Sequence, residues 1–370
     1  MLIAGTGLLF WNEGNFVKTK QSLKEAESVL VRVSDMSEVD PLLEGRLIHA
    51  SSLANTDDIL TDSLFGICET AISIRRKVEY YQWKESSSET RSTSRNRSET
   101  KTTYSYKKSW NLSPVNSQFF HTRGYDNFVL VTVDAQTVYA KDVSFGGYQL
   151  PHFIIKSISG SVPATPSLSA ETITYWEKKI ATDARNPKAN ASPSQQLVHI
   201  NGHVVYFGPS PNAPNIGDVR VTLTKTLPAD ISIIAKVTGN TFEPYQAAND
   251  KTVSLVSMGT VSAEKMFSGA HTSNVLWTWL FRLIGILLVI GGLRLMFSIL
   301  QALFTFIPFL GHILNVGIGL VCLMAGGVWS AFVISISWLW YLPIIGLIML
   351  VVAGTGIWFL KKRNEKSMRL

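Results

Sequence analysis

The stretch from Leu276 to Leu360 most limits what this chain can fold into. It contains 85 residues without an acid, and its basic or imidazole side chains are Arg282, Arg294 and His312. A helix needs about 20 apolar residues to cross the hydrocarbon core of a bilayer. This block is therefore long enough for three crossings with short connections. We predict a multi-pass α-helical membrane protein that also carries a large β-rich α+β extracytosolic domain.

A shorter apolar stretch, residues 1–11, opens the sequence and ends at Asn12 and Glu13. At about 1.5 Å per residue, a helix of this length reaches roughly 17 Å, about half of a bilayer core. We predict that residues 1–11 form part of an N-terminal transmembrane helix. A buried core segment is the alternative.

Residues 12–273 are rich in short runs of β-branched and aromatic side chains. Several runs alternate apolar with polar residues, as half-buried strands do, and residues 71–83 (AISIRRKVEYYQW) are the most regular. Within this β-rich domain, the spacing predicts a helix over 169–184 with Ser169 as its N-cap. Residues 85–103 lack large apolar side chains, so we predict a flexible loop there, as a hairpin excursion between two strands.

Charge gives the expected topology. We predict three transmembrane helices within residues 274–360, followed by a basic tail, residues 361–370. Because basic residues favour the cytosolic side, this tail is expected in the cytosol and the domain at 12–273 in the lumen or periplasm. Six of the seven net positive charges lie from Asn274 onward, which leaves the upstream domain nearly neutral. Nucleic-acid binding is not expected, since it needs a clustered basic surface.

The sequence contains no catalytic motif of the common hydrolases, kinases or nucleotide-binding proteins. Its two cysteines, Cys68 and Cys322, lie in different predicted regions and are not expected to pair. His199 and His203 could face one metal from adjacent strands, but no third ligand follows nearby. We therefore expect no catalytic residues, no metal and no cofactor, and predict that the protein is not an enzyme.

One predicted strand combines charged and aromatic residues in the way that binding interfaces do. An ordinary strand packed within its own sheet is the alternative. The candidate interaction residues are Arg75, Arg76, Glu79, Tyr81, Gln82 and Trp83.

The apolar block carries two arginines near predicted helix ends and several tryptophans near its boundaries. Arginines so placed can extend to the lipid headgroups, and tryptophans favour the membrane interface. A functional role for the arginines inside the bundle is the alternative. The predicted membrane or lipid contacts are Arg282, Arg294, Trp277, Trp279, Trp338 and Trp340.

Several segments together resemble the transmembrane protein 43 family, also called LUMA. They are NEGNFVKT, GRLIHAS, SLFGICETAISIRRKVEYYQW, TTYSY, NIGDVRVTL and NVLWTWLFRLIGILLVIGGL. The similarity runs over nearly the whole chain. It implies one N-terminal helix, a large lumenal or periplasmic domain and three C-terminal helices.

The resemblance also implies a role as a membrane organiser. It suggests a self-associating protein, a homo-oligomer in contact with membrane lipids and other membrane proteins, with lamins and emerin as partners only in an animal host. The expected location is the endoplasmic reticulum or inner nuclear membrane of a eukaryote, or the inner membrane of a bacterium. Our first hypothesis is therefore a non-enzymatic membrane scaffold. The alternative is a lipid-handling or channel-like protein, in which Arg282 or Arg294 contacts headgroups.

Overall fold

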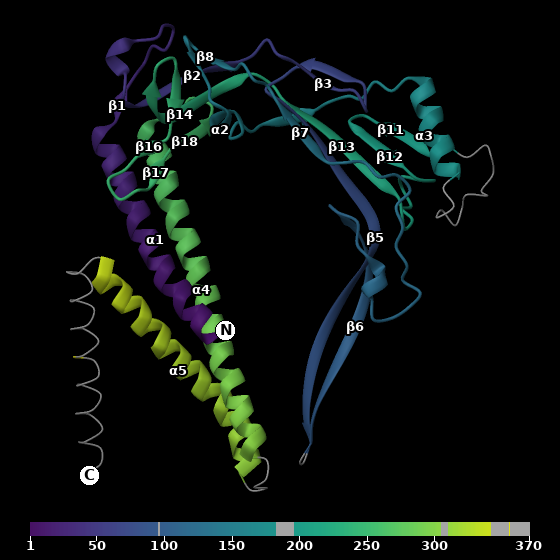
Figure 1. Cartoon of the computed structure of the whole chain (residues 1–370), viewed down its shortest axis with the longest axis vertical. Coiled ribbons are helices and arrows are strands. Elements are labelled where there is room, and N and C mark those ends of the chain that lie inside the picture. Colours follow the sequence, from purple (N-terminus) through teal and green to yellow (C-terminus); the bar gives the residue numbers. More distant parts are fainter. Residues whose placement is uncertain (95–96, 183–195, 305–309, 342–354, 356–370) are drawn as a thin grey trace. The chain divides into compact units, whose positions relative to one another are not determined.

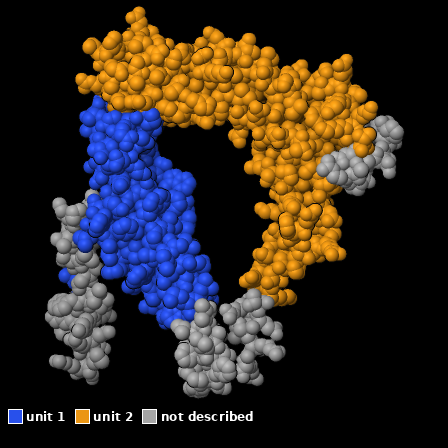
Figure 2. Space-filling model, viewed as in Figure 1, with its two compact units in different colours: residues 1–30, 244–255, 263–370 blue, residues 31–243, 256–262 orange. Residues whose placement is uncertain are grey.

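A computed structural model describes residues 1–94, 97–182, 196–304, 310–341 and 355. The chain divides into two compact units, coloured separately in Figure 2. Unit 1 consists of residues 1–30, 244–255 and 263–370, and unit 2 consists of residues 31–243 and 256–262.

The described residues of unit 1 form three helices, α1 (Leu2–Val29), α4 (Ala263–Phe304) and α5 (Leu310–Tyr341). Helices α1 and α4 lie side by side and run in opposite directions (Figure 1). Helix α5 packs against both. Unit 1 also contains a small antiparallel pair of strands, β16 (Tyr245–Gln246) and β17 (Thr252–Val253).

Glycines let these helices approach closely. A Cβ atom added to Gly5 of α1 would lie 2.9 Å from the carbonyl oxygen of Gly285 in α4. A Cβ atom added to Gly292 would lie 2.4 Å from the backbone nitrogen of Leu2. Small residues have this role where helices meet in membranes, because they allow backbone contact. The α1–α4 interface therefore has no room for larger side chains at these positions.

We expect Gly292→Leu to destabilise unit 1 by about 1–3 kcal/mol, because the new side chain overlaps the α1 backbone. The matched control is Gly269→Leu on the same helix, where an added Cβ atom meets nothing within 4 Å. Loss of helical circular dichroism during titration with a denaturing detergent would compare the two variants. Equal stability of both would contradict this account of the interface.

Unit 2 contains two large sheets. The first has the strand order β15-β14-β2-β8-β9, with β1 paired to β2 and β18 paired to β14. Strand β1 pairs parallel with β2, whereas β14 pairs antiparallel with β15 and β2, and β8 pairs antiparallel with β2 and β9. Its strands are β1 (Val31–Arg32), β2 (Leu47–Asn55), β8 (Ser144–Phe145), β9 (Tyr148–Gln149), β14 (Ala229–Thr238), β15 (Thr241–Glu243) and β18 (Leu255–Met258).

The second sheet has the order β11-β12-β13-β5-β6, with β10 paired to β13 and β7 paired to β5. Its pairings are antiparallel. Its strands are β5 (Ser73–Ser94), β6 (Arg97–Asn111), β7 (Gln136–Tyr139), β10 (Ser161–Pro163), β11 (Val198–Asn201), β12 (Val204–Phe207) and β13 (Val219–Thr226). The remaining elements of unit 2 are β3 (Ile59–Asp62), β4 (Ile67–Thr70), α2 (His152–Ile155), α3 (Ala170–Thr182) and the 3-10 turns Pro41–Leu43 and Ser117–Phe119.

One hydrophobic core serves both sheets. Strand β13 shows how the sequence builds it: Val219, Val221 and Leu223 are fully buried, whereas the residues between them are partly exposed. This alternation follows from the two-residue period of a strand. Helix α3 adds Trp176 and Ile180 to the same core. Helix α3 confirms the predicted helix, and the Oγ atom of Ser169 accepts a hydrogen bond from the backbone nitrogen of Thr172, as an N-cap does.

The predicted fold class, a multi-pass α-helical membrane protein, is wrong. Among the described residues, two helical segments are long and apolar enough to cross a membrane, Ala263–Phe297 and Gly319–Tyr341, and antiparallel sheets form most of unit 2. Helix α1 does not qualify because polar and charged residues follow its apolar start. Helix α5 runs without interruption from Leu310 to Tyr341. Most of the predicted third helix, and the tail at 361–370, lie outside the described residues.

Two local predictions in the upstream region are also wrong. Residues 12–29 continue helix α1 and do not begin a β-rich domain. Residues 85–94 and 97–103 are not a flexible loop, because β5 and β6 pair through Ser94 and Arg97, although the predicted pairing of two strands as a hairpin is confirmed. Backbone hydrogen bonds between the two strands order this segment, although its polar side chains bury little apolar surface. The result is a long two-stranded ribbon that extends away from the rest of its sheet (Figure 1).

Candidate functional site

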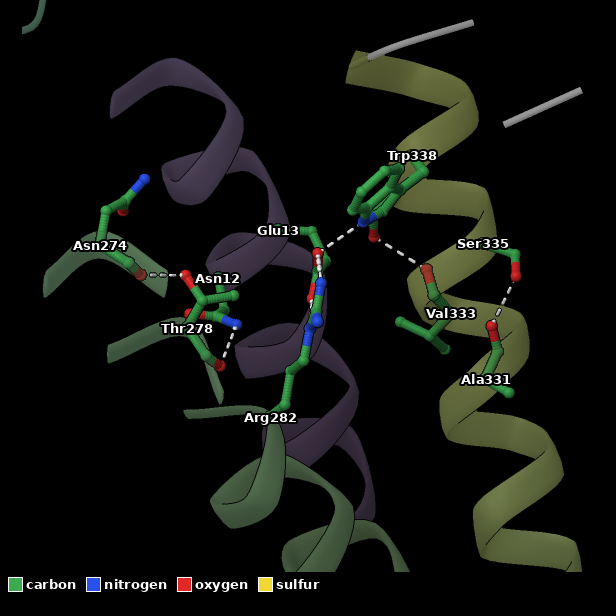
Figure 3. A network of polar contacts seen from close by, with 10 residues as sticks. Asn12, Glu13, Asn274, Thr278, Arg282, Ala331, Val333, Ser335 and Trp338 are labelled. Atoms are coloured by element: carbon green, nitrogen blue, oxygen red, sulfur yellow. Dashed lines mark hydrogen bonds and ion pairs between the residues drawn. The ribbon is translucent and has the colours of Figure 1, made fainter. Parts of the chain in front are cut away.

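A buried ion pair lies where the three helices of unit 1 meet (Figure 3). The Glu13 carboxylate on α1 is fully buried and accepts hydrogen bonds from Nε and Nη2 of Arg282 on α4, at 2.6 and 2.7 Å. Trp338 on α5 donates its indole Nε1–H to the same carboxylate at 2.6 Å. Both carboxylate oxygens therefore have partners, and each helix contributes one of the three side chains.

A second set of polar contacts joins α1 to α4 near the ion pair. The side-chain amide of Asn12 donates to the carbonyl oxygen of Thr278 at 3.1 Å. The side-chain amide of Asn274 donates to the carbonyl oxygen of Phe16 at 3.1 Å. Buried polar groups need such partners, because an unmade hydrogen bond away from water is costly. These contacts fix the register of α1 against α4.

Arg282 thus points toward Glu13, with its guanidinium carbon 4.9 Å from the ring centre of Trp279. The other predicted lipid-contact residues lie at the surface of unit 1: Arg294 is exposed, and Trp277, Trp279 and Trp340 are more than half exposed. Trp338 is only partly exposed because it contacts Glu13. The lipid contacts themselves stay a prediction.

Sequence reasoning missed Glu13 as the partner of Arg282, because the first helix was predicted to end before it. One signal was available. An acid directly after an apolar run and an arginine within another are each costly in a bilayer unless they meet. The pair was not predicted because Glu13 and Arg282 are 269 residues apart in the sequence.

The predicted interaction strand contributes to a second polar region, on β5 of unit 2. Arg76 is buried, and its Nη1 atom contacts the carboxylate of Asp62 on β3 at 2.7 and 2.8 Å. Its remaining nitrogens donate to the carbonyl oxygen of Asp134 and the side-chain oxygen of Gln136. This side chain is therefore held inside unit 2, whereas its neighbour Arg75 is exposed.

Glu79 is at the centre of a group of charged and aromatic side chains on the sheet. Its carboxylate accepts hydrogen bonds from Arg220 on β13 and from Lys77 on its own strand, each at 2.9 Å. The Arg220 guanidinium carbon lies 4.4 Å from the ring centre of Trp110, and Tyr81 packs against the same ring. Burial raises the pKa of Glu79, but the hydrogen bonds from Lys77 and Arg220 outweigh burial, so its pKa lies below the usual value.

Gln82 and Trp83 hold the following segment against the ribbon. The Gln82 side chain is buried, donates to the carbonyl oxygen of Phe128 and accepts from the backbone nitrogen of Val115. The backbone of Trp83 exchanges two hydrogen bonds with the side-chain amide of Asn127. Of the six predicted interaction residues, Arg76 and Gln82 are therefore buried structural contacts, and the interaction role of the set stays a prediction.

The two histidines considered as metal ligands lie on or beside the β11–β12 hairpin. Among the described residues, no group of three or more His, Cys, Asp or Glu side chains could hold a metal ion. His199 pairs across the strands with Tyr206, whose hydroxyl donates to Asp218. Burial and the Asp218 carboxylate raise the pKa of Tyr206. A tyrosine in this state keeps its proton and acts as a hydrogen-bond donor rather than a base.

These features define a class: a membrane protein with apolar helices, a buried ion pair among them and a strand-rich unit. A family model described as Transmembrane protein 43 matches residues 80–343. The chain therefore belongs to the transmembrane protein 43 family, which confirms the resemblance seen in the sequence. The family's name refers to a membrane location and to no reaction.

Relatives of this name cover most of the chain. Transmembrane protein 43 of Mus musculus is 27% identical over 368 residues, which are 95% of this chain and 86% of the relative. The human protein is 27% identical over 361 residues, covering 95% and 84% of the two chains. The Transmembrane protein 43 homolog of Drosophila melanogaster is 26% identical over 385 residues, covering 97% and 92%. No solved structure matches.

We expect Glu13→Ala to destabilise unit 1 by about 3–5 kcal/mol, because it leaves Arg282 buried without its counter-charge. The double variant Glu13→Met with Arg282→Met should recover most of this loss, since it removes both charges. Glu27→Ala, at an exposed position on the same helix, is the matched control. The measurement is unfolding in a denaturing detergent. A double variant as unstable as the single one would show that the pairing is not the cause.

The Glu79 contacts predict a pH dependence. Because the pKa of Glu79 is lowered by folding, its contribution to stability is present above the unfolded-state pKa of about 4.5 and is lost as pH falls through the folded-state value. We expect Glu79→Gln to cost about 1–2 kcal/mol at neutral pH. The difference from the wild type should shrink below pH 4.5. A difference independent of pH, measured by chemical unfolding at several pH values, would rule out the ion pair as its source.

Proposed function

We propose that this chain is a non-enzymatic integral membrane scaffold that self-associates and binds membrane or envelope partners through its strand-rich unit. The observation that carries the proposal is the β5–β6 ribbon. In a eukaryotic host, the family resemblance favours the endoplasmic reticulum or inner nuclear membrane as its location. In an animal host, lamins and emerin are then candidate partners.

The ribbon offers an open strand edge. Tyr81 and Trp83 direct their backbone groups away from β6, toward Asp218 and Asn127. In an antiparallel pair, the backbone N–H and C=O groups of the residues opposite them also point away from the partner strand. Every second residue of β6 therefore directs its backbone groups toward the free edge. Among the described residues, these outward groups have no backbone partner in the range 102–110. Such an edge is a template for another strand.

The pairing of charges supports a structural rather than a catalytic role. Three carboxylates that might act as acids or bases, Glu13, Asp62 and Glu79, each bind an arginine. Groups that are saturated in this way are poorly placed to exchange protons with a substrate. The lipid-handling alternative has weaker support, because Arg282 is engaged by Glu13.

A proline on the free edge tests the proposal. The backbone N–H of Thr102 points outward, because Thr102 pairs with Glu89 at a position equivalent to Trp83. Thr102→Pro should leave the ribbon intact, since proline is tolerated where the N–H faces outward, but should block an added strand. We expect the oligomer of the full-length protein in lipid nanodiscs to fall to the monomer, as measured by mass.

The matched control is Ser87→Pro, which places proline on the outer edge of β5 instead. We expect this variant to retain the oligomer, because Asn127 already covers part of that edge at Trp83. A monomeric wild type, or an oligomer that survives Thr102→Pro, would refute self-association through β6.

A further inference from the structure

Unit 2 has a cavity of about 600 Å³ beside strand β7 and the short helix α2. This volume is within the range of small-molecule sites. Its lining includes two lysines and a histidine, and none of the lining residues is acidic. The lining residues are Thr137, Tyr139, Ala140, Lys141, His152 and Lys156.

Local structure explains why these side chains converge. Thr137 and Tyr139 are two residues apart on β7, so they lie on the same face of the strand. His152 and Lys156 are four residues apart across one helical turn, and the backbone nitrogen of Lys156 donates to the carbonyl oxygen of His152 at 3.0 Å. The Tyr139 ring packs edge-on against the His152 ring, with 5.5 Å between their centres.

The walls of the cavity are held in place. Ile154 and Ile155 anchor α2 in the core, where both are fully buried or nearly so. The Asp58 carboxylate accepts hydrogen bonds from the backbone nitrogens of Lys141 and Asp142, at 2.7 and 3.0 Å. These two hydrogen bonds lower the pKa of Asp58, so it remains ionised. Its negative charge lies near Lys141 and offsets part of the positive charge there.

Several basic groups elsewhere in unit 2 are neutralised by a carboxylate. Arg76, Arg220 and Lys236 each bind a carboxylate. By contrast, the side chain of Lys156 has no hydrogen-bond or ion-pair partner in the part of the chain that the structure describes. The same holds for Arg75, which is the cross-strand neighbour of Thr137. Positive charge is therefore left available at a concave surface.

We propose that this cavity binds a small anion that carries a phosphate group. Two lysine ammonium groups, an imidazole and two hydroxyl groups can surround several phosphate oxygens, and lysine binds phosphate as a point charge. The phosphate can belong to a soluble molecule or to a lipid headgroup. The site does not depend on the scaffold role, because its residues are separate from the β6 edge.

The test uses the full-length protein in phosphatidylcholine nanodiscs. The soluble probes are inorganic phosphate and inositol trisphosphate, and the lipid probe is phosphatidylinositol 4-phosphate added to the nanodisc. The local readout is slower backbone hydrogen exchange in residues 137–141 and 152–156, followed during titration. We expect Lys141→Glu with Lys156→Glu to weaken binding at least tenfold. The matched control, Lys84→Glu with Lys178→Glu, changes the net charge equally at two exposed lysines and should bind like the wild type.

The outcomes separate the sources of the phosphate. Protection by inorganic phosphate or inositol trisphosphate but not by the phosphorylated lipid supports a soluble ligand, whereas protection by the phosphorylated lipid, with or without the soluble probes, supports a headgroup. No protection by any probe, or equal weakening in both double variants, overturns the proposal. If the charge reversal prevents folding, Lys141→Gln with Lys156→Gln gives the same comparison with a smaller expected loss. The oligomer measured for the β6 edge is unaffected by either result.

Discussion

The cost of placing a carboxylate among apolar helices governs the arrangement of unit 1. Glu13 is fully buried, so its charge requires partners that the apolar surroundings do not provide. Arg282 and Trp338 supply three hydrogen bonds from two other helices. The pairing therefore selects one relative placement of α1, α4 and α5, and close glycine contacts such as Gly292 on Leu2 then become possible. An apolar contact alone would tolerate several placements.

The same principle organises the polar parts of unit 2. Arg76 is stabilised inside the fold by Asp62, and Glu79 by Arg220 and Lys77. The pairs with Asp62 and Arg220 attach β3 and β13 to β5, which is the longest of the described strands and belongs to both the sheet and the ribbon. Two of the side chains that the sequence suggested for interaction, Arg76 and Glu79, thus join strands within the unit. Groups without such partners, as on the β6 edge and around the cavity beside α2, are where binding is more readily accommodated.

A segment of polar composition can be ordered when backbone hydrogen bonds between strands hold it. The stretch 85–103 has no large apolar side chains, yet residues 85–94 and 97–103 form a regular antiparallel ladder. Its start is anchored by Tyr81, Gln82 and Trp83, which contact Trp110 and the segment around Asn127. A membrane protein that carries such a ribbon presents an extended strand to neighbouring molecules. This geometry suits assembly better than turnover of a substrate.

The sequence by itself determined the apolar character of the C-terminal block, the strands that alternate apolar and polar residues, the helix capped by Ser169 and the family. Each follows from local composition or spacing, which a single segment carries. It did not determine that α1 continues to Val29, or that residues 85–94 and 97–103 are strands, because tertiary contacts and cross-strand pairing decide these. Only the tertiary structure brought Glu13 to Arg282 and Lys141 to Lys156. Residues far apart in the chain come together through packing, and no local sequence pattern indicates which of them will be in contact.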